Sequence, residues 1–134
     1  MAGYSKRALV DKLGIKSGAA IAILDAPHGY DRILGRLPPR VTRTATAAGP
    51  LDFIQFFTTE KRELERNFAG LARALAPAGM LWISWPKRGS GVATDLTEDV
   101  IRAVGLGGGL VDVKVAAVDD VWSGLKFVRR LEDR

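Results

Sequence analysis

The segment 52–85 constrains the fold of this chain more than any other stretch. It begins with one apolar run, DFIQFFT at 52–58, and ends with another, MLWISW at 80–85. Four apolar side chains between the runs recur at spacings of 4, 3 and 4 residues, namely Leu64, Phe68, Leu71 and Leu75. That spacing is the period of one helix face and predicts an amphipathic helix over 60–76. Two apolar strands around such a helix predict parallel pairing with a right-handed crossover.

The ends of the predicted helices also carry sequence signals. Thr59 stands where a side-chain cap would begin the first helix, and Pro77–Gly79 stands where a turn would end it. A second helix is predicted to begin at Asp95, with Glu98 completing a capping box. The run Gly105–Gly109 is expected to end that helix, because glycine is a poor helix former.

The rest of the chain alternates strands and helices in the same way. The other expected elements are short helices over 5–13 and 30–37, a buried strand over 19–24 and an outer strand over 40–47. Alternating side chains over 111–116 and a last run over 125–130 predict two strands, which their short link makes an antiparallel hairpin. We therefore expect a single α/β domain over 1–134. Its sheet is open, three-layered and mostly parallel, with an antiparallel hairpin strand at the C-terminal end.

Composition excludes several kinds of site. The 134 residues contain no cysteine and one histidine, so disulfides and thiolate ligands are excluded and a histidine zinc site has too few ligands. The N-terminal residues have no apolar core of signal-peptide length, and no window approaches the apolar length of a membrane span. We expect a bacterial, cytoplasmic protein that holds no metal and contacts no membrane.

The chain is basic, with a formal net charge of +5. This charge would help it to meet an anionic partner. The basic residues are nevertheless scattered, and no block of five or six like charges occurs. A mildly basic, solvated surface is therefore the expectation, and weak association with nucleic acid is kept as an alternative function.

Several stretches resemble known proteins. The segment LDFIQFF with LARALAPAGMLWISW resembles the middle strands of the class I S-adenosylmethionine-dependent methyltransferases, and VDVKVAAVDDVWSGLKFV resembles the reversed last strand of that Rossmann-like fold. More narrowly, the chain resembles a bacterial family of small proteins of unknown function, through AGYS, KLGI, WPKRGSGVATDLTEDV, GLVDVKVAAVD and WSGLKFVRR. The resemblance implies a shortened methyltransferase-like fold and brings no activity with it.

The turn after the first strand differs from what the methyltransferase class needs. That class has a glycine-rich turn there, because glycines let the backbone approach the cofactor. Here DAPHGY supplies only Gly29, Pro27 lacks an N–H, and His28 and Tyr30 add bulk. The next strand, in RVTRTATAAGP, offers no acid for ribose hydroxyls, and one strand–helix unit is missing after it. We predict no cofactor and no methyl transfer; a degenerate enzyme that uses S-adenosylmethionine or another nucleotide is the alternative.

A crevice at the carboxyl ends of the parallel strands is the expected place for a ligand. The stretches predicted to converge there are 25–30, 58–59, 85–91 and 119–124. The loop PKRGSG is the most suggestive, because it joins two cations to glycines that permit an anion-binding nest, and a helix N-terminus follows. The residues expected to bind a small anionic ligand are Asp25, His28, Lys87, Arg88, Ser90, Asp119 and Trp122. None is predicted to be catalytic or to hold a metal.

Each of these residues also has a structural interpretation. PKRGSG can be a flexible surface loop, and Asp25 can cap the turn that follows it. His28 can be a surface residue or a general base, and Trp122 can pack against the sheet. The predicted function is a non-catalytic binding or interaction module, for a small anionic ligand or a protein partner. An exposed edge strand would also allow two copies to pair.

Overall fold

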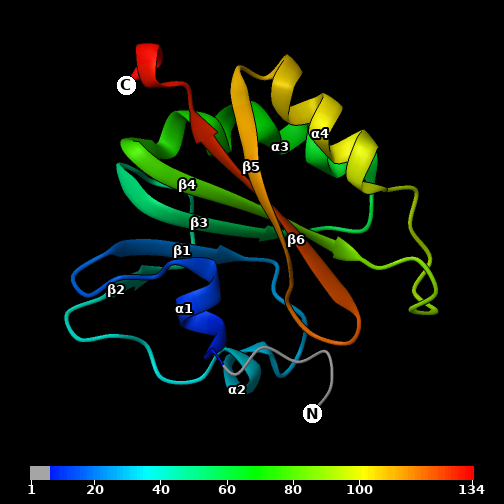
Figure 1. Ribbon diagram of the computed structural model, residues 1–134, viewed down its shortest axis with the longest axis horizontal. Coiled ribbons are helices and arrows are strands. Elements are labelled where there is room, and N and C mark those ends of the chain that lie inside the picture. The colour runs from blue at the N-terminus through cyan, green and yellow to red at the C-terminus, as the bar shows by residue number, and fades with distance from the viewer. Residues whose placement is uncertain (1–6) are drawn as a thin grey trace.

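A six-stranded sheet forms the centre of the computed structural model, which describes residues 7–134 (Figure 1). The strands are β1 (Ala20–Leu24), β2 (Thr42–Thr44), β3 (Leu51–Phe57), β4 (Leu75–Pro86), β5 (Leu110–Ala117) and β6 (Trp122–Arg129). Their order is β2-β1-β3-β4-β6-β5. The first four pair in parallel, whereas β6 is antiparallel to both β4 and β5. The predicted mostly parallel α/β sheet with an antiparallel C-terminal hairpin is confirmed.

Helices cover both faces of this sheet, which gives the three predicted layers (Figure 1). They are α1 (Leu9–Leu13), α2 (Tyr30–Leu34), α3 (Lys61–Ala74), α4 (Glu98–Gly107) and a final 3₁₀ turn at Leu131–Asp133. One core lies between the sheet and the α3 and α4 pair, and the other lies between the sheet and the α1 and α2 pair. No helix among residues 7–134 has the length and apolar character needed to cross a membrane.

The strand–helix–strand unit has the predicted crossover, but its helix ends differently. Leu64, Phe68 and Leu71 are buried against the sheet, as their spacing predicts. The helix ends at Ala74, and Leu75 continues directly as extended chain paired with Leu51. The next pairing on β3 joins Phe53 to Met80. Residues 76–79 therefore form an irregularity within β4, and the expected helix-ending turn at Pro77–Gly79 was wrong.

The N-terminus of α3 is capped by a distant residue. Thr59 was expected to cap it, but the backbone N–H of Lys61 instead donates to the Asp95 carboxylate at 2.8 Å. The Thr94 hydroxyl donates to the Thr59 carbonyl at 2.6 Å and holds the same loop in place. The loop after β4 thus satisfies an N–H group that the helix itself leaves without a partner.

The start and end of α4 also differ from the prediction. Its N-cap is Thr97, whose hydroxyl accepts from the Val100 N–H at 3.2 Å, so the proposed capping box of Asp95 and Glu98 was wrong. The helix ends within the predicted run Gly105–Gly109, but its last residue is Gly107, so Gly105 itself is helical. Gly105 is buried where α4 crosses the Phe127 ring, and packing rather than chain reversal explains this glycine.

The trans cap gives a first testable prediction. Replacing Asp95 by alanine should lower the free energy of unfolding by about 1 kcal/mol, because side-chain N-caps contribute about 0.5–2 kcal/mol. Asp95→Asn should keep most of that stability, since its amide oxygen can accept the same hydrogen bond. Urea unfolding measures the difference. Asp120 is exposed and has no hydrogen bond within residues 7–134, so Asp120→Ala is the control. An equal loss in both alanine variants would contradict the trans cap.

The elements near the N-terminus are shorter than predicted. The helix expected over 5–13 corresponds to α1, which begins at Leu9; positions 5 and 6 lie outside the described residues. The helix expected over 30–37 corresponds to α2, which ends at Leu34. The strand expected over 40–47 has three exposed residues, because β2 is an edge strand that pairs only with β1. β3 follows β2 with no helix or strand between them, which agrees with the predicted missing unit.

Candidate functional site

Three of the four stretches predicted to converge do meet at the carboxyl ends of the strands. The Lys87 N–H donates to the Val121 carbonyl at 2.7 Å, which fixes the PKRGSG loop beside the β5–β6 turn. The other end of the loop is fixed on Thr59 through Thr94. The stretch 25–30 follows β1 at the same edge but is not hydrogen-bonded to the loop, and its Tyr30 ring contacts the Phe57 ring of β3. The carboxyl edge therefore holds a loop anchored at both ends.

A cleft of about 540 Å³ opens beside this loop. The residues that line it are Trp85, Lys87, Arg88, Gly89, Val92, Ala93, Thr94, Leu96, Thr97, Glu98 and Ser123. Trp85 and Leu96 are buried and supply an apolar wall, whereas Lys87 and Arg88 supply positive charge. The volume lies within the range of sites that hold small molecules. An apolar wall beside two cations suits a ligand with a flat apolar part and a negative group.

The PKRGSG segment is an ordered double turn. Gly89 and Gly91 have φ angles of 83° and 88°, in the left-handed region that glycine adopts easily. The Ser90 N–H donates to the Lys87 carbonyl at 3.1 Å, and the Ser90 hydroxyl accepts from the Val92 N–H at 3.2 Å. The hydroxyl of Ser90 is thus part of the turn, and its own hydrogen remains for a ligand.

The two cations that line the cleft, Lys87 and Arg88, differ from the nearby Arg102 in their ion pairing. Neither Lys87 nor Arg88 forms an ion pair in the part of the chain that the structure describes. Arg102, by contrast, is paired with Glu98 and Asp99 of the first turn of α4, and with a further carboxylate on β5. The helix N-terminus expected to attract an anion therefore already carries negative side chains. Binding of an anion would depend on Lys87 and Arg88.

Asp119 and Trp122 hold the β5–β6 turn and do not line the cleft. One Asp119 carboxylate oxygen accepts from the Val121 N–H at 2.8 Å and from the Trp122 N–H at 2.7 Å. The Trp122 ring meets the Phe57 ring edge-on, with centroids 5.2 Å apart, on the face that α1 and α2 cover. These two predicted residues position the hairpin against which the PKRGSG loop is fixed.

Asp25 and His28 lie apart from the cleft. Asp25 is exposed at the end of β1, with φ at 56°, and lines a separate cavity of about 290 Å³ that reaches Asn67 of α3. His28 is exposed and makes no hydrogen bond to any residue from 7 to 134. Tyr30 was expected to crowd the turn, but its ring is buried 4.7 Å from the Phe57 ring. That expectation was wrong, because Tyr30 begins α2 and faces the core.

The residues around the β1 turn do not fit S-adenosylmethionine. Pro27 has no N–H to offer, and the turn contains a single glycine. β2 is followed by Ala45 and Thr46, so the strand carries no acid of its own at its carboxyl end for ribose hydroxyls, and the Asp31 carboxylate beside it is paired with Arg43 at 2.9 Å. Burial of the Tyr30 ring in the core removes one predicted obstacle, and the single glycine, the proline and the missing acid remain.

Two buried side-chain hydrogen bonds connect α2, β3 and β4, and the sequence pattern did not predict them. The Tyr30 hydroxyl donates to Gln55 Oε1 at 2.6 Å, and Gln55 Nε2 donates to the Ser84 hydroxyl oxygen at 3.1 Å. All three residues are buried. Burial raises the pKa of Tyr30 well above its ordinary value, so the hydroxyl keeps its proton. The glutamine inside the apolar run DFIQFF was the available signal.

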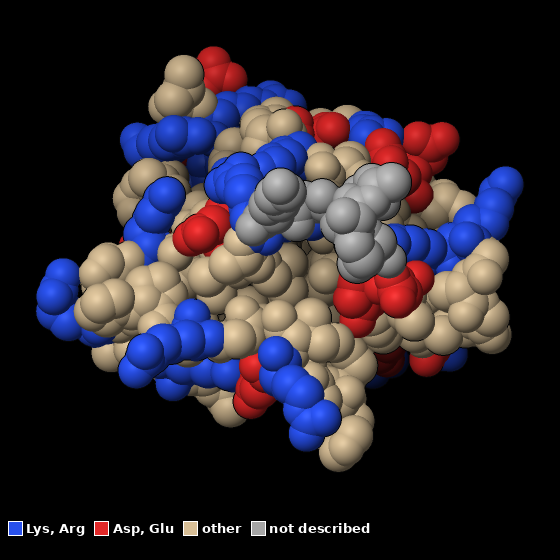
Figure 2. Space-filling model, turned by 60° about the horizontal axis from the view of Figure 1, so that its bottom comes forward, with Lys and Arg blue, Asp and Glu red and all other residues tan. Residues whose placement is uncertain are grey.

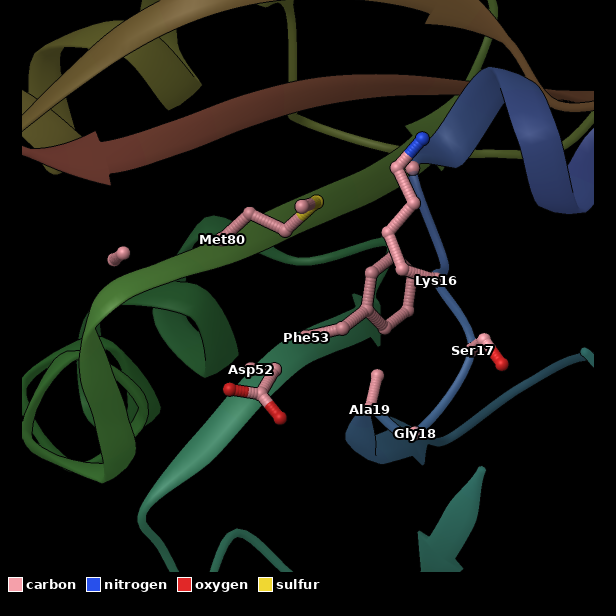
Figure 3. Close-up of a pocket in the computed structure, with 9 residues that line it drawn as sticks. Lys16, Ser17, Gly18, Ala19, Asp52, Phe53 and Met80 are labelled. Atoms are coloured by element: carbon pink, nitrogen blue, oxygen red, sulfur yellow. The ribbon is translucent and has the colours of Figure 1, made fainter. Parts of the chain in front are cut away.

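A further pocket of about 300 Å³ lies at the opposite edge, by the amino ends of β1 and β3 (Figure 3). Met80 and Phe53 form its apolar side, and the loop that contains Lys16 borders it. The Asp52 carboxylate accepts from the Ala20 N–H at 2.8 Å and is thereby tied to the start of β1. The sequence pattern did not predict a site at these residues.

The strand order, the single reversed strand and the helices on both faces define a class I methyltransferase fold, a Rossmann-like fold. No family model and no curated protein matches the chain. Among solved structures, a SAM dependent methyltransferase from Aquifex aeolicus is 13% identical and matches with a TM-score of 0.66, over 89% of this chain and 86% of that one. A TehB-like SAM-dependent methyltransferase from Corynebacterium glutamicum is 14% identical, with a TM-score of 0.57 over 96% of this chain and 91% of its own.

A third similar structure has its cofactor. Magnesium protoporphyrin IX methyltransferase from Synechocystis, with bound SAM, is 14% identical, with a TM-score of 0.57 over 91% of this chain and 74% of that one. At such identities the likeness establishes the fold alone. The fold of the chain is therefore that of the methyltransferases, and its activity has to be argued from its own residues.

Proposed function

We propose that this chain is a non-catalytic binding module with a methyltransferase fold, and that it binds a small anionic ligand in the cleft beside PKRGSG. The observation that carries the proposal is that the buried Trp85 lines the same cleft as Lys87 and Arg88, two cations that form no ion pair with any residue from 7 to 134. A nucleoside monophosphate has the matching chemistry, because its base is flat and apolar on its faces and its phosphate is a dianion.

The residues of the turn after β1 support the non-catalytic part of the proposal. Its single glycine, its proline and the lack of an acid after β2 remove contacts through which this fold holds a dinucleotide or S-adenosylmethionine. The PKRGSG cleft, in contrast, is bounded by a loop whose two ends are hydrogen-bonded in place. A preformed site of this kind loses little entropy when a ligand binds.

Ligand-induced thermal shift tests the proposal. A panel of nucleoside monophosphates at constant ionic strength should raise the melting temperature, because a ligand at about 100 times its dissociation constant adds about 2.7 kcal/mol to stability. The double variant Lys87→Ala and Arg88→Ala should lose the shift. Lys61→Ala with Arg62→Ala removes the same charge from exposed positions of α3 and should keep it.

Two results would overturn the proposal. The first is an unchanged ligand-induced rise in melting temperature in the Lys87 and Arg88 double variant, which would show that the ligand binds outside this cleft. The second is a clear upward shift with S-adenosylmethionine or S-adenosylhomocysteine, which would favour the degenerate enzyme over the binding module.

A further inference from the structure

Two lysines face each other across the β5–β6 hairpin. Lys114 and Lys126 are direct cross-strand partners in the register of the two strands. β6 lies between β5 and β4 in the sheet. The cross-strand partner of Lys126 on β4 is Trp82, which is fully buried. Like charges placed directly opposite in a sheet are unfavourable, and partial burial increases the cost. Burial, Lys114 and Lys16 together lower the pKa of Lys126.

Lys16 brings a third positive charge to the same place. Figure 3 shows its side chain passing the Phe53 ring, with the amine turned away from Asp52. The chain that leads to Lys16 is fixed beside Lys126, because the Trp82 Nε1–H donates to the Leu13 carbonyl at 2.9 Å and Trp82 is the cross-strand partner of Lys126. The amine of Lys114 lies 3.4 Å from the Lys12 carbonyl oxygen, at the end of α1. The three lysines therefore belong to one surface, between the end of α1 and the β5–β6 hairpin.

No carboxylate in the described part of the chain forms an ion pair with these three lysines. Among residues 7–134, the ion pairs involve Arg43, Arg66 and Arg102, and none involves a lysine. Figure 2 looks onto the lower side of the molecule in Figure 1 and shows Lys and Arg side chains gathered there in several groups. Each ammonium has three N–H donors, and Lys114 uses one of them on the Lys12 carbonyl.

We propose that Lys16, Lys114 and Lys126 form a second binding site, for a phosphate group, on the α1 side of the sheet. A phosphate dianion would accept hydrogen bonds from the three ammonium groups and would cancel the repulsion between Lys114 and Lys126. The neighbouring pocket of Met80 and Phe53, which Lys16 also borders, leaves room for an apolar substituent on that phosphate. The site is separate from the PKRGSG cleft and does not depend on the function proposed for it.

Calorimetric titration with inorganic pyrophosphate, at an ionic strength held constant with sodium chloride, tests this site. Lys114→Gln with Lys126→Gln should raise the dissociation constant by at least about tenfold, because charge-assisted hydrogen bonds to phosphate are strong. Lys61→Gln with Arg62→Gln changes the net charge equally and should leave it within about twofold of the wild type. The titrations are repeated in a Lys87→Ala and Arg88→Ala background, which removes the cations of the cleft, so that the binding that remains there reports the lysine site alone.

A short RNA oligonucleotide, titrated in parallel, distinguishes a free phosphate from a nucleic-acid backbone as the source of the group. The site is supported if wild-type protein binds either probe and the Lys114 and Lys126 double variant does not. Lys16→Gln, on a loop, is a second variant whose folding is not in question, and it should weaken binding of the same probe. The proposal is overturned if wild-type protein binds neither probe, or if both lysine variants bind as tightly as the wild type.

Discussion

Replacing Gly105 by alanine is expected to lower the free energy of unfolding by about 2 kcal/mol or more, because overpacking a core costs about 1–3 kcal/mol and sometimes more. A methyl group on Gly105 would lie 2.0 Å from Cε1 of Phe127. Phe127 has no exposed surface and meets the Phe68 ring edge-on at 5.8 Å, so its ring has no room to move away. The loss should appear although alanine is the better helix former by about 1 kcal/mol.

Gly107 provides the matched control in the same helix. A methyl group there would meet nothing within 4 Å, so Gly107→Ala should leave stability unchanged or raise it by up to about 1 kcal/mol. Thermal or urea unfolding of the two variants measures the contrast. If Gly105→Ala were as stable as the wild type, α4 would have to lie farther from β6 than the structure places it.

The second large effect is expected at Gln55. Gln55→Leu should cost about 3 kcal/mol, because it leaves the buried hydroxyls of Tyr30 and Ser84 without partners, at about 1–3 kcal/mol for each buried polar group. Near-ultraviolet circular dichroism should at the same time report altered packing of the Tyr30 ring, which lies between the sheet and α2.

A triple variant separates lost hydrogen bonds from lost packing at this position. Tyr30→Phe and Ser84→Ala remove the two hydroxyls that Gln55→Leu leaves unpaired. Combined with Gln55→Leu, they should restore at least part of the stability, since an apolar replacement of all partners can be nearly neutral. A triple variant less stable than Gln55→Leu would show that packing, not hydrogen bonding, holds this region together.

The fold could be predicted because its signals are local and repeated. The helix stripe from Leu64 to Leu71 and the apolar runs on either side of it specify a crossover without reference to the rest of the chain. The helix ends could not be predicted as well, because they depend on contacts distant in sequence. Lys61 is capped by Asp95, 34 positions later, and local reasoning chose Thr59 instead.

The candidate site could be predicted only in part, for the same reason. The PKRGSG loop and the β5–β6 turn were expected to meet and do, because both follow strands at one edge of the sheet. Lys16, Lys114 and Lys126 were not considered together, because sequence spacing says nothing about a cross-strand register until the hairpin is fixed. Tyr30 was misjudged, because a residue in a turn motif can equally be the first inward-facing residue of a helix.

The trans cap of α3 limits how the loop after β4 can change. Its last part, at Thr94 and Asp95, stabilises a helix, and its first part, at Lys87 and Arg88, lines the cleft. Substitutions over 88–93 can therefore change the lining of the cleft without removing a hydrogen bond to the start of α3. A graft of this loop into a related scaffold would have to carry Thr94 and Asp95 with it, or the first N–H group of the recipient helix would lose this cap.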